Sequence, residues 1–239
     1  MRELSAADFD PIEDAPHNSG QPMPFGFIAN ALAEIESISG KNSQTIVKEI
    51  IANVFRAAIA VNPDELANIF YFFIIKLAPE YEGIETMVGQ ELVLKCVAKS
   101  CGKSPAQIRN AFKEEGDLGV VISQGKKTQN TLGNFFAAKN AKKKNKLLFK
   151  DVFGAFKRIS ELSGNSSVQE KENAIVRLCQ EADNNEAKFI IRWLLKNMRT
   201  GVAEKTVLSA LARAICYTPP NLMRSPKQVL NMKKKIGEA

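Results

Sequence analysis

The sequence predicts an all-α protein, a compact helical domain of about ten to twelve helices with at most one small hairpin. Three observations support this prediction. Apolar residues recur at intervals of three and four along most of the chain, which places them on one face of a helix. Proline stands twice where a helix would begin. A single short segment has the β-branched run that is typical of a strand.

The helix boundaries follow from spacing and from two proline-containing start signals. At residues 62–65 (NPDE), Asn62 can cap the helix while proline fills the first helical position. Residues 104–107 (SPAQ) repeat the arrangement with a serine cap and a glutamine that can reach back. The helices expected from these signals cover residues 27–38, 44–60, 64–77, 89–100, 105–114, 152–162, 168–182, 186–197 and 203–216. The strand-like exception is residues 118–123 (LGVVIS), which could pair with a segment near 132–136.

An internal repeat predicts how the chain is organised. Phe-Gly, an amphipathic helix, a Ser-Gly turn, two long helices and a glycine-bearing turn occur in the same order twice. A repeated helical unit is typical of a duplicated fold, so the copies could be related by a pseudo-two-fold axis. We expect a lead-in (1–20), a helical domain (21–220) and a basic C-terminal segment (221–239). The domain would contain halves of about 25–115 and 152–218, joined by a lysine-rich connection (116–151).

Positive charge is concentrated in two parts of the chain. The net charge is +7, and the segment from Gln124 to Lys150 contains eight lysines and no acidic residue. A second cluster consists of Arg224, Lys227, Lys233, Lys234 and Lys235. Such basic stripes attract polyanions, although a solvated lysine-rich loop is an open alternative. An anionic membrane is disfavoured because the lysine segment lacks the amphipathic helical pattern of surface-binding helices.

Several other classes of protein and site are disfavoured. The longest apolar run, residues 69–75, is far shorter than the roughly 18 residues of a membrane span. The acidic N-terminus has no apolar core that would act as a secretory signal, so the four cysteines are expected to be reduced thiols. Cys96 and Cys101 are spaced for a metal, but the single histidine, His17, is distant in sequence. We predict no catalytic residue, cofactor site or metal site in this chain.

The segment from Lys196 to Gly201 (KNMRTG) is the main candidate binding site. It reads as a tight turn between two helices, with a glycine that lets an anion approach the backbone. If a helix starts near Gly201, the amides from Val202 onward lack intrahelical partners and lie at the positive end of the helix dipole. Lys196, Arg199 and Lys205 add positive charge. An ordinary glycine-capped joint between helices is the alternative.

Two other turns are candidate binding sites. Residues 82–91 contain two glycines but are acidic, which weakens an equal role for this segment. Gly125, Lys126 and Lys127 are expected to form a second basic turn. The carboxylates Glu114, Glu115 and Asp117 are interpreted as a solvated cluster at a helix end.

Three segments, residues 9–36, 83–121 and 186–214, resemble the N-terminal DNA-binding domain of eukaryotic ATP-dependent DNA ligases of the DNA ligase I type. The most specific motif appears here as Ala187-Lys188-Phe189-Ile190, Arg192, Leu195 and Arg199-Thr200-Gly201-Val202-Ala203-Glu204. A second appears as Glu115-Gly116-Asp117-Leu118-Gly119. The lysine run 139–146 departs from the family, whose members often have a proline-rich link in that place.

The resemblance implies a helical domain that engages nicked duplex DNA through backbone and minor-groove contacts and helps the ligase encircle it in replication and repair. Its partners would be the adenylation and OB-fold domains of the same ligase, in the nucleus, with the domain itself monomeric. DNA contacts carry over to Arg199, Thr200, Gly201 and Val202, more loosely to Lys196, and weakly to Gly125, Lys126 and Lys127.

The catalytic motif of the family, Lys-x-Asp-Gly, does not occur in these 239 residues. We therefore expect a piece of a larger ligase, inactive alone and without a cofactor of its own, whose parent enzyme would use ATP and Mg²⁺. The alternative function is a helical-repeat scaffold that binds acidic protein partners through the lysine-rich loop.

Overall fold

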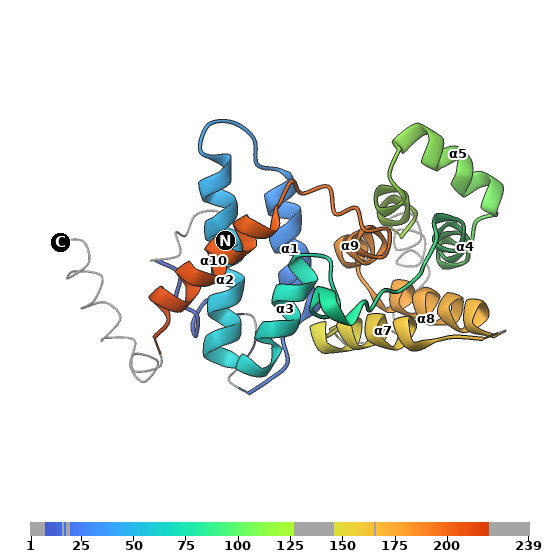
Figure 1. Cartoon of the computed structure of the whole chain (residues 1–239). Helices are drawn as coiled ribbons and strands as arrows, with labels where there is room; N and C mark the ends of the chain where they lie inside the picture. The colour runs from blue at the N-terminus through green and yellow to red at the C-terminus, as the bar shows by residue number, and fades with distance from the viewer. Residues whose placement is uncertain (1–7, 16, 18–19, 127–145, 165, 220–239) are drawn as a thin grey trace, which may run out of the picture. The chain divides into compact units, whose positions relative to one another are not determined.

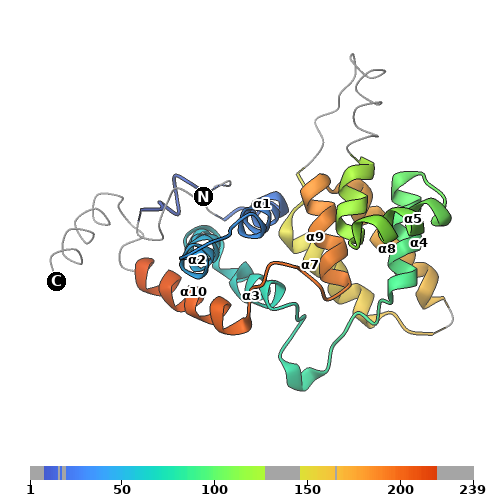
Figure 2. The same ribbon diagram turned by 90° about the horizontal axis from the view of Figure 1, so that it is seen from above.

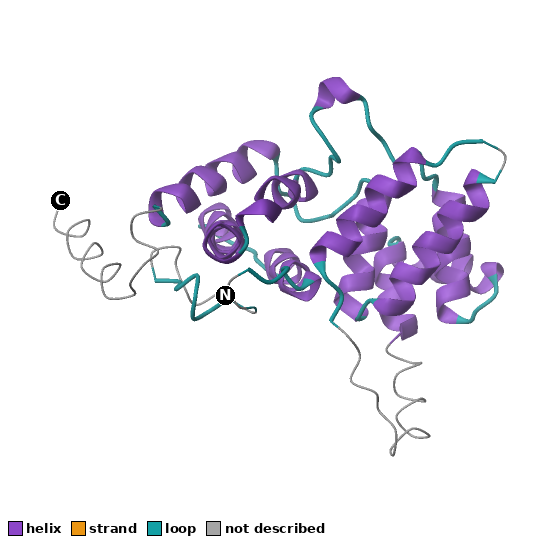
Figure 3. Cartoon of the chain, turned by 90° about the horizontal axis from the view of Figure 1, so that it is seen from below, coloured by secondary structure: helices purple, strands orange, loops and turns teal. Residues whose placement is uncertain are grey.

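The computed structural model describes residues 8–15, 17, 20–126, 146–164 and 166–219. Within these ranges the chain forms helices joined by loops, as Figure 3 shows, and the all-α prediction is confirmed. The described residues contain no strand, and their single β-bridge pairs Pro24 with Leu148 in antiparallel sense.

One compact unit contains Met1–Met23, Ala31–Ile74 and Thr200–Ala239. Its helices are α2 (Ser43–Val61), α3 (Leu66–Phe73), α10 (Glu204–Tyr217) and the later part of α1 (Phe25–Glu36), and a 3₁₀ turn (Pro63–Glu65) leads into α3. Helix α10 packs against α2 (Figure 1). Val207, Ala210 and Ala214 of α10 are fully buried. Their spacing puts them on one face, and the small alanines let the two helices approach closely.

The other unit contains Pro24–Asn30 and Ile75–Arg199. Its helices are α4 (Gln90–Cys101), α5 (Pro105–Glu115), α7 (Phe149–Glu161), α8 (Ser167–Glu181) and α9 (Asn184–Leu194), with a further helix over residues 118–126. Helix α4 packs against α8 and α5 (Figure 2). The rings of Phe156 and Trp193 stack with their centroids 4.3 Å apart, and both side chains are buried. Aromatic packing thus attaches α9, which precedes the main candidate site, to the core of this unit.

The structure corrects the strand expected at residues 118–123, because this segment is helical. Leu118, Val121 and Ile122 are all buried at helical spacing, so burial of one helical face outweighs the strand preference of the β-branched residues. The proposed pairing segment near 132–136 lies outside the described residues.

The predicted helix start at residues 104–107 is confirmed together with its cap. The Ser104 hydroxyl accepts the N–H of Gln107 and the Gln107 side chain accepts the N–H of Ser104, which forms a complete capping box. The start at residues 62–65 is also confirmed, because a 3₁₀ turn begins at Pro63 and leads into α3. Only the side-chain cap expected from Asn62 is wrong, since Asn62 makes no cap hydrogen bond. Glu65 accepts the N–H of Met23 at 2.9 Å. The two compact units do not correspond to the expected repeated halves, which cover about residues 25–115 and 152–218. The internal repeat therefore stays a prediction.

Candidate nucleic-acid interface

The predicted turn at Lys196–Gly201 is part of a longer connection. Helix α9 ends at Leu194 and α10 begins at Glu204, with Ala203 as the residue before it. The helix expected over residues 203–216 is therefore confirmed to within one residue, and it starts three residues after Gly201. The boundary between the two compact units falls between Arg199 and Thr200. The two parts of the connection are therefore described separately.

The first part of the connection begins at the C-terminal end of α9, where Lys196 occupies a position that is usually glycine. The N–H of Asn197 donates to the carbonyl of Arg192, and the N–H of Lys196 donates to the carbonyl of Trp193, both at 2.9 Å. This pattern is a Schellman motif, whose left-handed position is usually glycine. Lys196 occupies it with φ 53°. The motif turns the chain sharply at the end of α9 and fixes the backbone that leads to Arg199.

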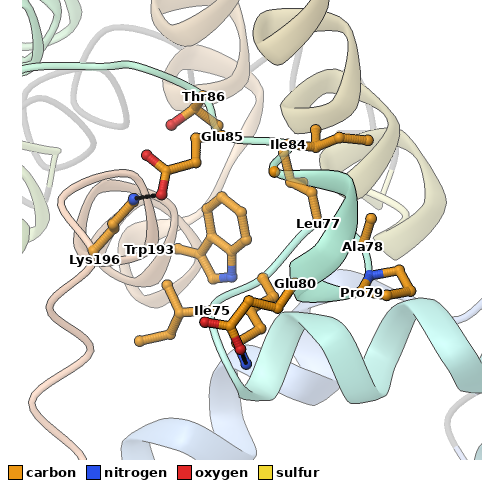
Figure 4. A pocket seen from close by; sticks show the side chains of 12 residues that line it. Ile75, Leu77, Ala78, Pro79, Glu80, Ile84, Glu85, Thr86, Trp193 and Lys196 are labelled. Carbon is orange, nitrogen blue, oxygen red and sulfur yellow. Dashed lines mark ion pairs between the residues drawn. The ribbon is translucent and has the colours of Figure 1, made fainter.

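Lys196 is paired within its own unit. Its Nζ lies 2.9 Å from Oε1 of Glu85, and both side chains are about half exposed. Figure 4 shows this ion pair beside Trp193, at the edge of a cavity of about 130 Å³. An exposed pair of this kind contributes about 0–1 kcal/mol, so a phosphate can compete with Glu85 for Lys196.

Arg199 is held by the turn that follows α5. Its Nη2 donates to the carbonyl of Gly116, and its Nε lies 3.5 Å from Oδ2 of Asp117. The side chain is 45% exposed, so the guanidinium is anchored on one side and open to solvent. Arg199 also has a left-handed backbone, with φ 55°, which an L-residue adopts at a cost of about 1–2 kcal/mol. The contacts of the guanidinium help to offset that cost.

Asp117 is a buried carboxylate with two arginines beside it. Its Oδ2 accepts from Nε and Nη2 of Arg192 at 3.0 and 2.7 Å, and its Oδ1 accepts the N–H of Gly119 at 2.8 Å. Burial acts to raise the pKa of Asp117. The hydrogen bond and charge of Arg192, the N–H of Gly119 and the charge of Arg199 outweigh burial, so the pKa is lowered. Asp117 is therefore ionised at neutral pH.

The second part of the connection, in the other unit, is open to solvent. Gly201 is exposed, has φ 64°, and a Cβ built on it would meet no atom within 4 Å. Thr200 and Val202 are half-buried, and Lys205 is exposed in the first turn of α10. Ala203 makes no side-chain cap for α10, and Glu204 places an acid in the first turn of the helix.

The second predicted basic turn is wrong. Gly125 and Lys126 belong to the helix over residues 118–126, and both are buried. A Cβ at Gly125 would lie 2.6 Å from Sγ of Cys101, so this glycine allows close packing of two helices. Nζ of Lys126 donates to the carbonyl of Cys179. Lys127 lies outside the described residues, as does the lysine run 139–146.

The sequence interpretation missed the buried pair of Asp117 and Arg192. The sequence predicts that Asp117 is solvated together with Glu114 and Glu115, but the Asp117 side chain is only 7% exposed. The sequence carries no signal for this pair, because helical spacing places Arg192 on the same side of α9 as the polar residues Asn185 and Lys188. Among the residues that the structure describes, no group of three or more His, Cys, Asp or Glu side chains could hold a metal. The same residues include no helix that is long and apolar enough to cross a membrane.

Comparison with known proteins identifies similar chains. A family model described as DNA ligase N terminus matches residues 24–212. The chain is 32% identical to DNA ligase 1 of Dictyostelium discoideum over 230 residues, which are 96% of this chain and 18% of that protein. It is 31% identical to DNA ligase 1 of Saccharomyces cerevisiae over 211 residues, 88% of this chain and 26% of that protein. It is 30% identical to DNA ligase 2 of Thermofilum pendens over 193 residues, 80% of this chain and 31% of that protein. The chain thus spans less than a third of the length of each of these relatives.

Proposed function

Because the chain belongs to the DNA ligase N-terminus family, we propose that it is the DNA-binding domain of an ATP-dependent DNA ligase. In this proposal it engages nicked duplex DNA through backbone and minor-groove contacts and helps the enzyme encircle the duplex during nick sealing. The observation that carries the proposal is Arg199, a guanidinium that is anchored on one side and 45% exposed on a family motif.

The chemistry of the candidate residues favours phosphate over base recognition. Arg199 can donate to phosphate oxygens, and such charge-assisted bonds are shorter and stronger than neutral ones. Gly201 leaves open space at its backbone, so a phosphate can approach the amides of the second part of the connection. Thr200, Val202, Lys196 and Lys205 complete the proposed contact residues. Contacts of this kind orient a protein on DNA and carry little sequence information.

The proposal extends to the rest of the enzyme. The parent protein would use ATP and Mg²⁺ for phosphodiester formation, and the partners of this domain would be the adenylation and OB-fold domains of the same ligase. The eukaryotic relatives support a nuclear location and a duty in replication and repair. The alternative, a scaffold for acidic protein partners, depended on the lysine run 139–146, and no observation in the described residues favours it.

The first prediction tests DNA binding itself. The chain should bind a labelled nicked duplex, and a duplex of unrelated sequence, with similar affinity, because phosphates and the minor groove offer little sequence information. Affinity should fall steeply from about 50 to 200 mM salt, since each neutralised phosphate contributes about 0.9 to the slope of log K against log salt. Fluorescence anisotropy over a salt series measures both quantities. Absence of binding at low salt, or a shallow slope with strong sequence preference, would contradict the proposal.

A further inference from the structure

Two arginines share the single carboxylate of Asp117, and they share it unequally. Arg192 makes two hydrogen bonds to Oδ2, at 2.7 and 3.0 Å, and its side chain is 3% exposed. Arg199 approaches the same oxygen only to 3.5 Å and is 45% exposed. The cluster has two positive charges and one negative charge. Its excess positive charge therefore belongs to the arginine that solvent can reach.

Arg192 also fixes the backbone on which Arg199 stands. Its Nη1 donates to the carbonyl of Met198 at 3.3 Å, one residue before Arg199. Its own carbonyl accepts the N–H of Asn197 at 2.9 Å. A single buried residue thus holds the connection through both its side chain and its main chain. The planar guanidinium is suited to this task because its donors are fixed relative to one another.

The turn that presents Asp117 is packed directly against α9. A Cβ at Gly119 would lie 2.8 Å from the carbonyl of Lys188 and 2.9 Å from Cγ of Arg192, so no side chain fits at this position. This close approach brings Gly116, whose carbonyl accepts from Arg199, to the same place as Asp117. Among the described residues, Arg199 makes these two contacts through Nη2 and Nε and no hydrogen bond through Nη1. The edge of the guanidinium formed by Nε and Nη2 is anchored, and the N–H groups of Nη1 can donate to a ligand.

We infer that Asp117 and Arg192 are positioning residues, which hold Arg199 in one orientation for a DNA phosphate. The inference rests on the proposed DNA-binding function and adds a mechanism to it. A free arginine on a loop must lose side-chain rotamer freedom when it binds, whereas an anchored one has already lost it. Asp117 therefore strengthens DNA binding although its own charge repels phosphate. Simple electrostatics makes the opposite prediction, that removal of this acid tightens binding.

The test removes the buried pair without changing net charge. The double variant Asp117→Leu with Arg192→Met replaces both charged partners by apolar residues of similar size, a change that proteins often tolerate. We expect the variant to remain folded with a lower melting temperature, because the N–H of Gly119 and the carbonyl of Met198 lose hydrogen-bond partners. Affinity for nicked duplex should fall about five- to tenfold, and the salt slope should decrease by about one. The change in slope reports a lost phosphate contact, which a purely structural role would not produce.

The matched control is the exposed pair Arg177 and Glu181 on α8, joined at 2.9 Å. The double variant Arg177→Gln with Glu181→Gln has the same charge balance and should bind as the parent does. If the Asp117/Arg192 variant is folded and binds DNA with parental affinity and slope, the inference fails and the proposed function stands. If the parent chain itself does not bind DNA, the proposed function fails.

If the Asp117/Arg192 double variant does not fold, a second variant tests the positioning role. Arg199→Lys keeps the positive charge but cannot span both the Gly116 carbonyl and the Asp117 carboxylate with a rigid fork. Affinity should fall several-fold although the charge is unchanged. Parental affinity in Arg199→Lys would overturn the positioning role, because charge alone would then be sufficient.

Discussion

At the scale of single residues, the cations that the sequence offers for DNA contact differ in the groups that hold them. Lys196 is paired with Glu85 in an exposed contact, whereas Arg199 is attached to a buried carboxylate and a backbone carbonyl. Lys126, which the sequence presents as one more cation, is buried and donates to the carbonyl of Cys179. Exposure and partners, more than charge, therefore decide which of these residues can meet a phosphate.

A charge reversal at Arg199 tests its proposed contact. Arg199→Glu should weaken binding to nicked duplex by more than the roughly 1–3 kcal/mol of a lost charge-assisted hydrogen bond, since an attraction becomes a repulsion. Arg177→Glu is the control, because it makes the same change of charge at an 80% exposed side chain on α8. Anisotropy titrations at one salt concentration compare the two variants. Equal losses would show that Arg199 contributes only general electrostatics.

At the scale of elements, some helix ends are determined by the local sequence and others by tertiary structure. The capping box at Ser104 needs only Ser104 and Gln107, which are near neighbours in sequence. The end of α9 is different, because its left-handed Lys196 has no local signature that would predict it. The strand expected at residues 118–123 is a helix for a similar reason: its buried face is defined by what packs on it.

Ser104→Ala tests the contribution of the capping box. The variant should lose about 1 kcal/mol of the free energy of unfolding, since a helix amide loses its partner. Ser166→Ala, at the residue before α8, should lose less, because Ser166 makes no cap hydrogen bond and bonds to Glu170 instead. Urea denaturation followed by circular dichroism measures both. DNA affinity should be unchanged in either variant, and an equal loss of stability would argue against the cap.

At the scale of the whole molecule, the described residues form two compact units, each built from separated segments of the chain. Both units contribute part of the connection from α9 to α10, with Arg199 in one and Gly201 in the other. A chain organised in this way cannot be shortened to either sequence half without removing parts of both units.

The chain of residues 1–239 should not react with ATP. No lysine stands in a Lys-x-Asp-Gly motif, so the expected nucleophile for adenylation is absent from this sequence. Incubation with radiolabelled ATP and Mg²⁺, followed by denaturing electrophoresis, should show no labelled band. A stable lysine–AMP adduct on this chain would contradict the proposal that the chain is a DNA-binding domain alone.

The sequence by itself determined the helical class, most helix positions and the family, because helical spacing, proline starts and family motifs are local patterns. It also identified Arg199 as a candidate contact. Tertiary structure alone decided that Gly125 and Lys126 are buried and that Asp117, Arg192 and Arg199 meet. Asp117 and Arg192 are far apart in sequence, and a carboxylate at a helix end looks the same whether solvent or an arginine faces it. Only the packing of residues 116–119 on α9 distinguishes the two cases, and that packing depends on contacts between segments distant in the chain.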